Sequence, residues 1–214
     1  MSRIRYLLSA LLLILLFTAC EDIFTNNLFS EFQRDPDNLS KDQLLARASY
    51  VGDDRAEAAK LYDALKGKVS ADDDADVLLT MTDLALTASG VLDELQGLIK
   101  VGIDGDLDDA DALAAVLDGS LDSVDYSYVE EAQQQIVAAQ AAGGAVTTDQ
   151  YVFVTIGLIM QAADEDDGVE SVADLTFAPN SPLVLFVGKA REDLEAQGKS
   201  GTGLKELEDY LTRP

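Results

Sequence analysis

The spacing of apolar residues from residue 40 to the C-terminus is the feature that most constrains how this chain folds. Leucine, valine, isoleucine, methionine and alanine recur every three or four positions, in runs separated by glycines and acidic residues. This period places the apolar side chains on one face of an α-helix, whereas a half-buried strand alternates every second residue. We therefore predict a single all-α domain over residues 40–214, built from about nine helices that form antiparallel hairpins.

Nine runs fit the helical period. They cover residues 44–51, 58–66, 77–89, 91–99, 107–118, 127–142, 147–163, 182–197 and 204–211. Capping boxes, in which two side chains satisfy the free backbone groups of a helix start, are predicted at Ser40, Ser127 and Thr147. Pro182 suits a first helical position. The apolar, partly β-branched run over 151–160 also fits a strand, but its length and its continuation favour a helix.

The first four runs form two pairs with a common spacing. Sliding the sequence by 34 residues places Leu44 on Leu78 and Leu61 on Leu95. This is the length of a tetratricopeptide repeat, and residues 40–101 resemble two degenerate hairpins of that family. The resemblance implies an α-solenoid with a concave binding face. The alternative is an ordinary helical bundle whose hairpins share a length.

The N-terminal residues have the composition of an export signal. Arg3 and Arg5 precede an apolar stretch over residues 6–17 that only Ser9 interrupts. A stretch of this length is too short to span a hydrocarbon layer about 30 Å thick at about 1.5 Å per helical residue. We therefore predict a signal peptide over residues 1–19 and not a retained membrane helix.

The single cysteine of the chain directly follows this stretch, in the order Phe17, Thr18, Ala19, Cys20. This segment resembles the cleavage box of bacterial lipoproteins. The resemblance implies cleavage between Ala19 and Cys20, a thioether-linked diacylglycerol on Cys20, and an N-acyl chain such as palmitate. Residues 20–39 are then the lipidated cysteine and a tether. The alternative is an ordinary thiol behind a cleavable signal.

The charge and composition exclude several classes of function. The chain has no histidine and one cysteine, so imidazole-dependent catalysis, histidine-ligated metals and intramolecular disulfides are excluded. The formal net charge of −25 repels phosphate backbones, which argues against nucleic-acid binding. Cleavage after Ala19 leaves 13 basic and 40 acidic residues, 28 of them aspartates. This excess fits either a saline habitat or cation binding, and the sequence leaves both open.

The acidic runs do not have the spacing of a calcium loop. Counted from Asp104, position six of an EF-hand loop is Asp109 and position twelve is Ala115, where glycine and glutamate are needed. The runs at residues 72–76 and 164–168 fail in the same way. We interpret these runs as solvated helix starts near the positive end of the helix dipole, and we predict no metal site.

Other motifs are incomplete as well. Gly198, Lys199 and Ser200 end like a phosphate-binding loop, but Asp193 stands where that loop needs glycine, and a helix cap is the better interpretation. No pair of carboxylates is singled out for catalysis. We therefore predict no catalytic residues and no cofactor. Four tyrosines could line a ligand site, although core positions are the commoner outcome for tyrosine. They are Tyr126, Tyr128, Tyr151 and Tyr210.

These observations predict a lipid-anchored protein of the bacterial cell envelope, at the outer membrane or the periplasmic face, that acts as a non-catalytic helical-repeat scaffold. Its acidic surface favours envelope proteins or cationic peptides as partners, besides the membrane itself. The alternative is an accessory or solute-binding lipoprotein of a periplasmic transport system. An open charged groove would favour protein partners, and an enclosed apolar cavity would favour a solute. The ligand-binding residues, the leaflet and the oligomeric state do not follow from the sequence.

The variant Cys20→Ser tests the lipid anchor. Serine cannot form the thioether, so we expect the variant to keep its signal peptide or to leave the membrane fraction. Two or three acyl chains, at about 0.8 kcal/mol per buried CH₂, hold the wild type in the detergent phase of a phase-partitioning experiment. A Cys20→Ser chain that stayed in the detergent phase with a processed N-terminus would contradict the anchor.

Overall fold

The computed structural model describes residues 34–94, 121–165, 175 and 177–212. Within these ranges the chain forms α-helices and two short 3-10 helices without any strand, which confirms the predicted all-α class. The α-helices are α2 (Lys41–Ala48), α3 (Arg55–Lys66), α4 (Ala75–Ser89), α7 (Tyr126–Ala141), α8 (Thr148–Glu165), α9 (Pro182–Ala196) and α10 (Thr202–Leu211). The 3-10 helices are η1 (Pro36–Asn38) and η2 (Leu121–Ser123).

The described ranges contain seven α-helices and not the predicted nine. Each of the seven coincides with one predicted run. Of the other two, the run over 91–99 is helical as far as residue 94, and its remainder lies outside the described residues. The run over 107–118 lies outside them entirely. None of the helices in the described ranges combines the length and the apolar content of a membrane-spanning segment.

Two of the three predicted capping boxes form. The Ser40 hydroxyl oxygen accepts from the Gln43 backbone N–H at 3.3 Å, and the Gln43 amide oxygen accepts from the Ser40 N–H at 3.0 Å. Thr147 and Gln150 make the same reciprocal pair at the start of α8. The predicted start at Ser127 is wrong, because Asp125 caps α7 and accepts from the Ser127 backbone N–H at 3.2 Å. The Ser127 hydroxyl also donates to Asp125, so it no longer serves as the cap.

The apolar run over 151–160 is helical and lies within α8. Eight residues of this helix are buried, among them Tyr151, Val154 and Met160. On periodicity alone, an apolar run of this kind is compatible with a strand or with a helix. The contacts with neighbouring helices decide between the two. The helix interpretation of the sequence is therefore confirmed.

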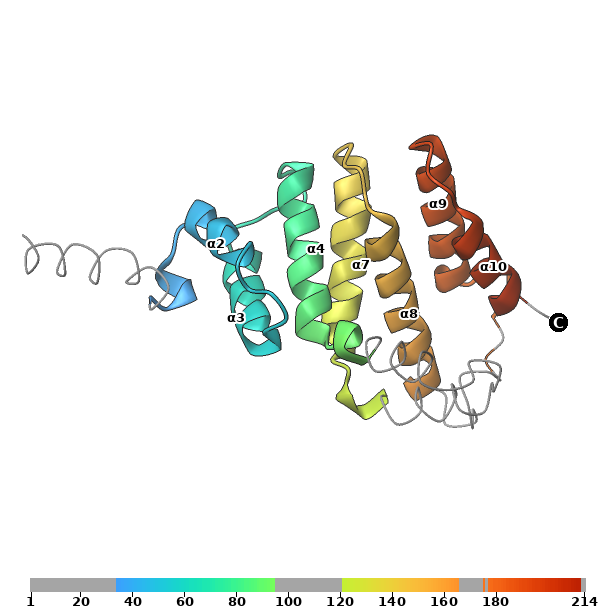
Figure 1. The fold of residues 1–214 in the computed structure, drawn as a ribbon, viewed down its shortest axis with the longest axis horizontal. Coiled ribbons are helices and arrows are strands. Elements are labelled where there is room, and N and C mark those ends of the chain that lie inside the picture. The colour runs from blue at the N-terminus through green and yellow to red at the C-terminus, as the bar shows by residue number, and fades with distance from the viewer. Residues whose placement is uncertain (1–33, 95–120, 166–174, 176, 213–214) are drawn as a thin grey trace, which may run out of the picture.

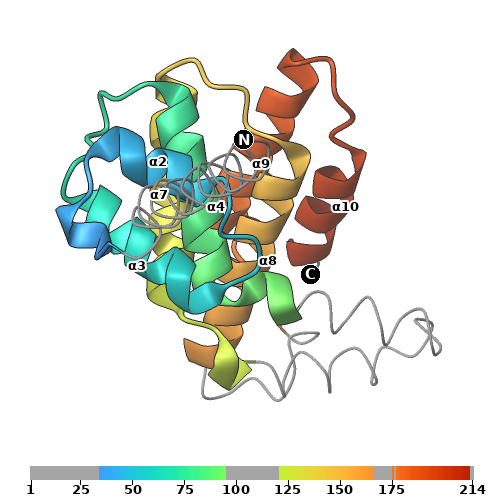
Figure 2. The same ribbon diagram turned by 60° about the vertical axis from the view of Figure 1, so that its left-hand side comes forward.

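The helices follow one another as antiparallel neighbours in a row that starts at α2 and ends at α10 (Figure 1). Each helix contacts the next described helix of the chain, from α2 and α3 through α4, α7 and α8 to α9 and α10. Helix α4 also contacts α2 and α8. Figure 2, turned by 60°, shows α2 and α3 on one side of the molecule and α10 on the other.

Helix α4 contacts four other α-helices. It contacts α2, α3, α7 and α8, and its most extensive contact is with α7, which starts more than thirty residues later in the chain. The sequence predicted two hairpins over residues 40–101. In the second of them, residues 77–89 were expected to pair with residues 91–99. Residues 95–101 lie outside the described residues, so that pairing stays a prediction beside the observed one with α7.

An arginine of α3 closes the C-terminal end of α4. The Arg55 Nε donates to the Ala88 carbonyl at 2.8 Å, and its Nη1 donates to the Ser123 carbonyl at 2.7 Å. Gly90 follows α4 with φ of 81°, the left-handed conformation that glycine adopts without steric cost. A Cβ on Gly90 would overlap the Arg55 guanidinium. Glycine at this position therefore allows the left-handed turn after α4. It also leaves space for the Arg55 side chain, which links α3 to α4 and η2.

The variant Gly90→Ala tests this arrangement. We expect it to lower the free energy of unfolding by about 2 kcal/mol, from about 1 kcal/mol of left-handed backbone strain and a further ~1 kcal/mol for disturbing the Arg55 hydrogen bonds. Gly143→Ala is the matched control, because Gly143 has φ of 80° and a Cβ there would meet no other atom within 4 Å. Urea unfolding measures both variants. Equal losses would show that Arg55 contributes nothing at this position.

Candidate functional site

A groove of about 330 Å³ runs between α2 and α4 and is open to solvent. The α4 side presents residues spaced three or four apart, which therefore lie on one helix face. The apolar part of the lining comes from Leu45, Ala48, Val51 and Leu84, and the polar part from Ser49, Thr80, Asp83 and Thr87, with Gly52 at one end. The groove thus joins an apolar surface to a short polar edge.

Asp83 is the only charged residue of this lining. Its Oδ1 accepts a hydrogen bond from the Gln150 side chain of α8 at 2.8 Å. Gln150 is only 6% exposed, and its amide oxygen is held by the Thr147 backbone N–H at 3.0 Å. The glutamine that caps α8 therefore also positions a carboxylate on α4.

Desolvation by the surrounding helices raises the pKa of the Asp83 carboxyl above its ordinary value, and the hydrogen bond from Gln150 opposes this only in part. Asp83 is nevertheless an exposed residue, so the effect of desolvation on its charge is small. The carboxyl is thus accessible from the groove while its charge is poorly compensated by the protein.

The tyrosines that the sequence suggested as a ligand lining do not share one site. Tyr151 is fully buried between helices, where its hydroxyl donates to Asp193 at 2.7 Å and accepts from Gln140 at 2.6 Å. The Tyr126 hydroxyl donates to the Leu121 carbonyl at 2.9 Å. Tyr128 donates to Asp63 at 3.2 Å. None of these three residues lines the α2–α4 groove, and the side chain of Tyr210 lies outside the described residues.

The phenol groups keep their protons at neutral pH. Burial, with the nearby negative charge of Asp63, raises the pKa of Tyr128 to about 12. Burial and the hydrogen bond with Asp193 raise the pKa of Tyr151 further. A tyrosine that is protonated in this way donates a hydrogen bond and does not act as a base.

The segment around Lys199 has the structure of a helix end. Gly198 follows α9 with φ of 74°, and a helix precedes it where a phosphate loop requires a strand. The Lys199 ammonium donates to the Gln197 side chain at 2.6 Å and to the Val146 carbonyl at 3.4 Å. This agrees with the interpretation of residues 198–200 as a cap and turn.

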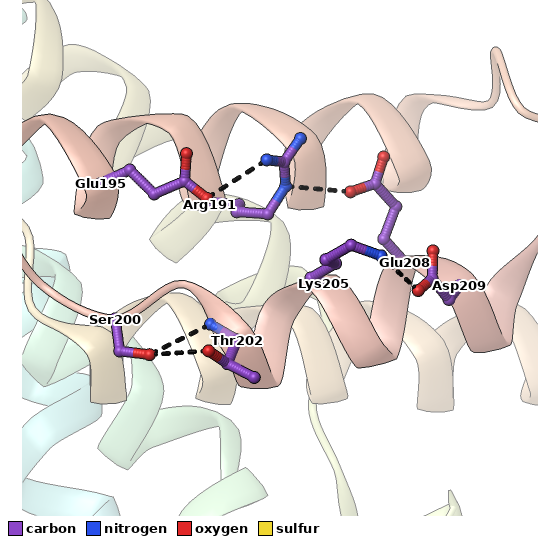
Figure 3. A network of polar contacts seen from close by, with 7 residues as sticks. All are labelled: Arg191, Glu195, Ser200, Thr202, Lys205, Glu208 and Asp209. Atoms are coloured by element: carbon purple, nitrogen blue, oxygen red, sulfur yellow. Dashed lines mark hydrogen bonds and ion pairs between the residues drawn. The ribbon is translucent and has the colours of Figure 1, made fainter.

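A polar network joins α9 to α10 beyond this turn (Figure 3). Arg191 lies between Glu195 and Glu208, at 3.3 and 3.2 Å, and Lys205 pairs with Asp209 at 2.6 Å. Both cations therefore already have carboxylate partners, and the network holds the last helix against α9.

Other residues singled out from the sequence are placed as follows. Ala19 and Cys20 lie outside the described residues, as does the acidic run from Asp104. In the run at 72–76, Asp73 pairs with Lys41 and accepts the Ser70 backbone N–H. Across the part of the chain that the structure describes, no three acidic or cysteine side chains gather in a way that could hold a metal ion.

Sequence reasoning missed Asp83, although a signal was present. Thr80, Asp83 and Thr87 form a polar stripe at helical spacing within the otherwise apolar α4. A polar stripe on a largely buried helix indicates a face that is not covered by the core. What the sequence does not show is that α2 and α8 lie beside this stripe.

Comparison with protein-family models, with curated proteins and with solved structures finds no match for this chain.

The variant Asp83→Asn tests how the groove carboxylate affects stability. The folded pKa lies above the unfolded one, so this group favours folding below the unfolded pKa, and the contribution is lost as pH rises through the folded pKa. Asparagine keeps the acceptor for Gln150 without the charge. We therefore expect Asp83→Asn to be more stable than wild type at about pH 7, with the difference shrinking below about pH 3.9.

Urea unfolding at both pH values measures this effect. Glu192→Gln on α9 is the matched control, since Glu192 is exposed and its loss changes the net charge equally. A stabilisation of the same size in the control would assign the effect to net charge and not to the groove.

Proposed function

We propose that this protein is a lipid-anchored scaffold of the bacterial cell envelope whose α2–α4 groove binds a segment of another envelope protein, without catalysis. The anchor rests on the sequence, in which a basic and apolar leader ends at Ala19 and Cys20. The binding role rests on one structural observation: the groove is open, and it combines an apolar floor with a polar edge. Such a surface suits a protein segment, which supplies apolar and polar side chains side by side.

The position of the groove supports this proposal. It lies between α2 and α4, which contact each other although α3 separates them in the chain. This surface is formed by residues distant in the chain and is therefore stable only in the folded domain. Extended surfaces of this kind are used for binding in helical-repeat proteins.

The openness of the groove also bears on the alternative function. A solute-binding component would enclose its ligand in a largely apolar cavity with a few polar groups. The groove between α2 and α4 is partly open to solvent and not enclosed, which favours a protein segment over an enclosed solute.

Site-specific photocrosslinking in intact cells tests the proposed function. We expect a photoreactive amino acid at Ser49 or Thr87, which line the groove, to give a discrete adduct with one envelope protein. The same amino acid at the exposed Glu192 of α9 is the control and should not give this adduct. Purification of the adduct partner and its binding to the isolated full chain complete the test.

Two outcomes would contradict the proposal. Identical adducts from Ser49, Thr87 and Glu192 would indicate encounters that do not depend on the groove. No protein adduct from either groove position, with the chain correctly exported, would show that the groove is not a binding surface for envelope proteins.

A further inference from the structure

The carboxylate of Asp83 is the only charged group in the lining of the α2–α4 groove. The lining consists of apolar and hydroxyl-bearing residues, a glycine and Asp83, so a bound segment meets one carboxylate beside an apolar surface. The side-chain amide nitrogen of Gln150 donates a hydrogen bond to Oδ1 of this carboxylate at 2.8 Å. The side chain is thus fixed in position before any ligand arrives, which reduces the entropy lost on binding.

Three cations of the neighbouring helices have partners outside the groove. On α2, Arg47 pairs with Glu57 and Lys41 pairs with Asp73. At the start of α3, Arg55 donates to the carbonyls at the ends of α4 and η2. The hydrogen bond to Asp83 comes from a neutral amide. The carboxylate is therefore held in a partly desolvated groove without a compensating positive charge in the described part of the chain.

Asp83 is exposed to solvent, and no cation offsets its charge in the groove lining, so a cation of a partner would meet an attraction that no other cation of the lining opposes. Nothing in the packing of α4 requires the carboxylate. Thr80 and Thr87, on the same face, are neutral. A partner that brings a cation into the groove would supply the missing compensation.

We propose that the groove recognises a lysine side chain of an amphipathic partner segment, with the ammonium on Asp83 and the aliphatic stem on Leu45, Ala48 and Leu84. This inference rests on the proposed function and names the chemistry of the segment. Lysine places a compact cation at the end of a four-carbon stem that packs on apolar surface.

The Gln150 amide occupies one acceptor site of Asp83 Oδ1, and acceptor sites of the carboxylate remain for a cation. Gln150 thus acts as a positioning residue that orients Asp83.

Fluorescence anisotropy with synthetic peptides tests the proposal on the full chain isolated in detergent. The probe is a labelled leucine- and alanine-rich amphipathic peptide with one central lysine, and its matched partner carries acetyl-lysine at that position. We expect the lysine peptide to bind at least about tenfold more tightly, as for one charge-assisted hydrogen bond. The variant Asp83→Asn should abolish this preference while keeping the acceptor for Gln150, and Glu192→Gln should preserve it.

Several outcomes would overturn the inference. Equal binding of the two peptides, or an unchanged preference in Asp83→Asn, would remove the lysine contact but leave the protein-binding function intact. Absence of binding by both peptides, together with failed photocrosslinking, would remove the function as well. Sedimentation of the chain alone completes the test, since a dimer that dissociates in Asp83→Asn would identify a second copy as the occupant instead.

Discussion

The burial of α4 among its neighbours is the interaction on which the rest of the structure depends. Its core residues include Leu78, Met81, Leu84 and Ala85, which are at most 4% exposed. Burial of apolar surface contributes about 25 cal/mol per Å², so a helix that contacts four others contributes more than one packed on a single hairpin partner. Arg55 then fixes the end of this helix by donating to the Ala88 carbonyl, and its Nη1 donates to the Ser123 carbonyl of η2. Helix α4 thus joins α2 and α3 to α7 and α8.

The same central position explains the groove. A helix that packs on α2, α3, α7 and α8 still leaves one strip of its surface between α2 and α8, and in α4 this strip carries threonines and Asp83. The carboxylate lowers stability at neutral pH because the protein desolvates it without pairing it with a cation. Groups that are unfavourable for folding are commonly retained where they serve binding. Helix α4 therefore supplies both core residues and residues of the groove lining, and Leu84 belongs to both.

The acidic character of the chain acts at a larger scale than this site. A net charge of −25 creates a negative potential over the whole surface, which steers positively charged partners toward the protein but does not select one of them. Selection requires a fixed group in a shaped surface. The described surface provides this combination at Asp83, where Gln150 orients the carboxylate beside an apolar floor. At the α9–α10 network, by contrast, Arg191 and Lys205 are already paired with carboxylates of α9 and α10.

The sequence by itself determined the helical class, the position of each described helix and most helix ends. These features depend on residues within a few positions of one another, as in the Ser40–Gln43 capping box or the left-handed glycine after α4. Tertiary structure alone decided that α4 packs on α7 and that Gln150 meets Asp83, 67 residues away in the chain. Apolar periodicity shows which face of a helix is buried but not which other helix buries it. A groove between two helices depends on which helices pack together, so it is visible only in the folded domain.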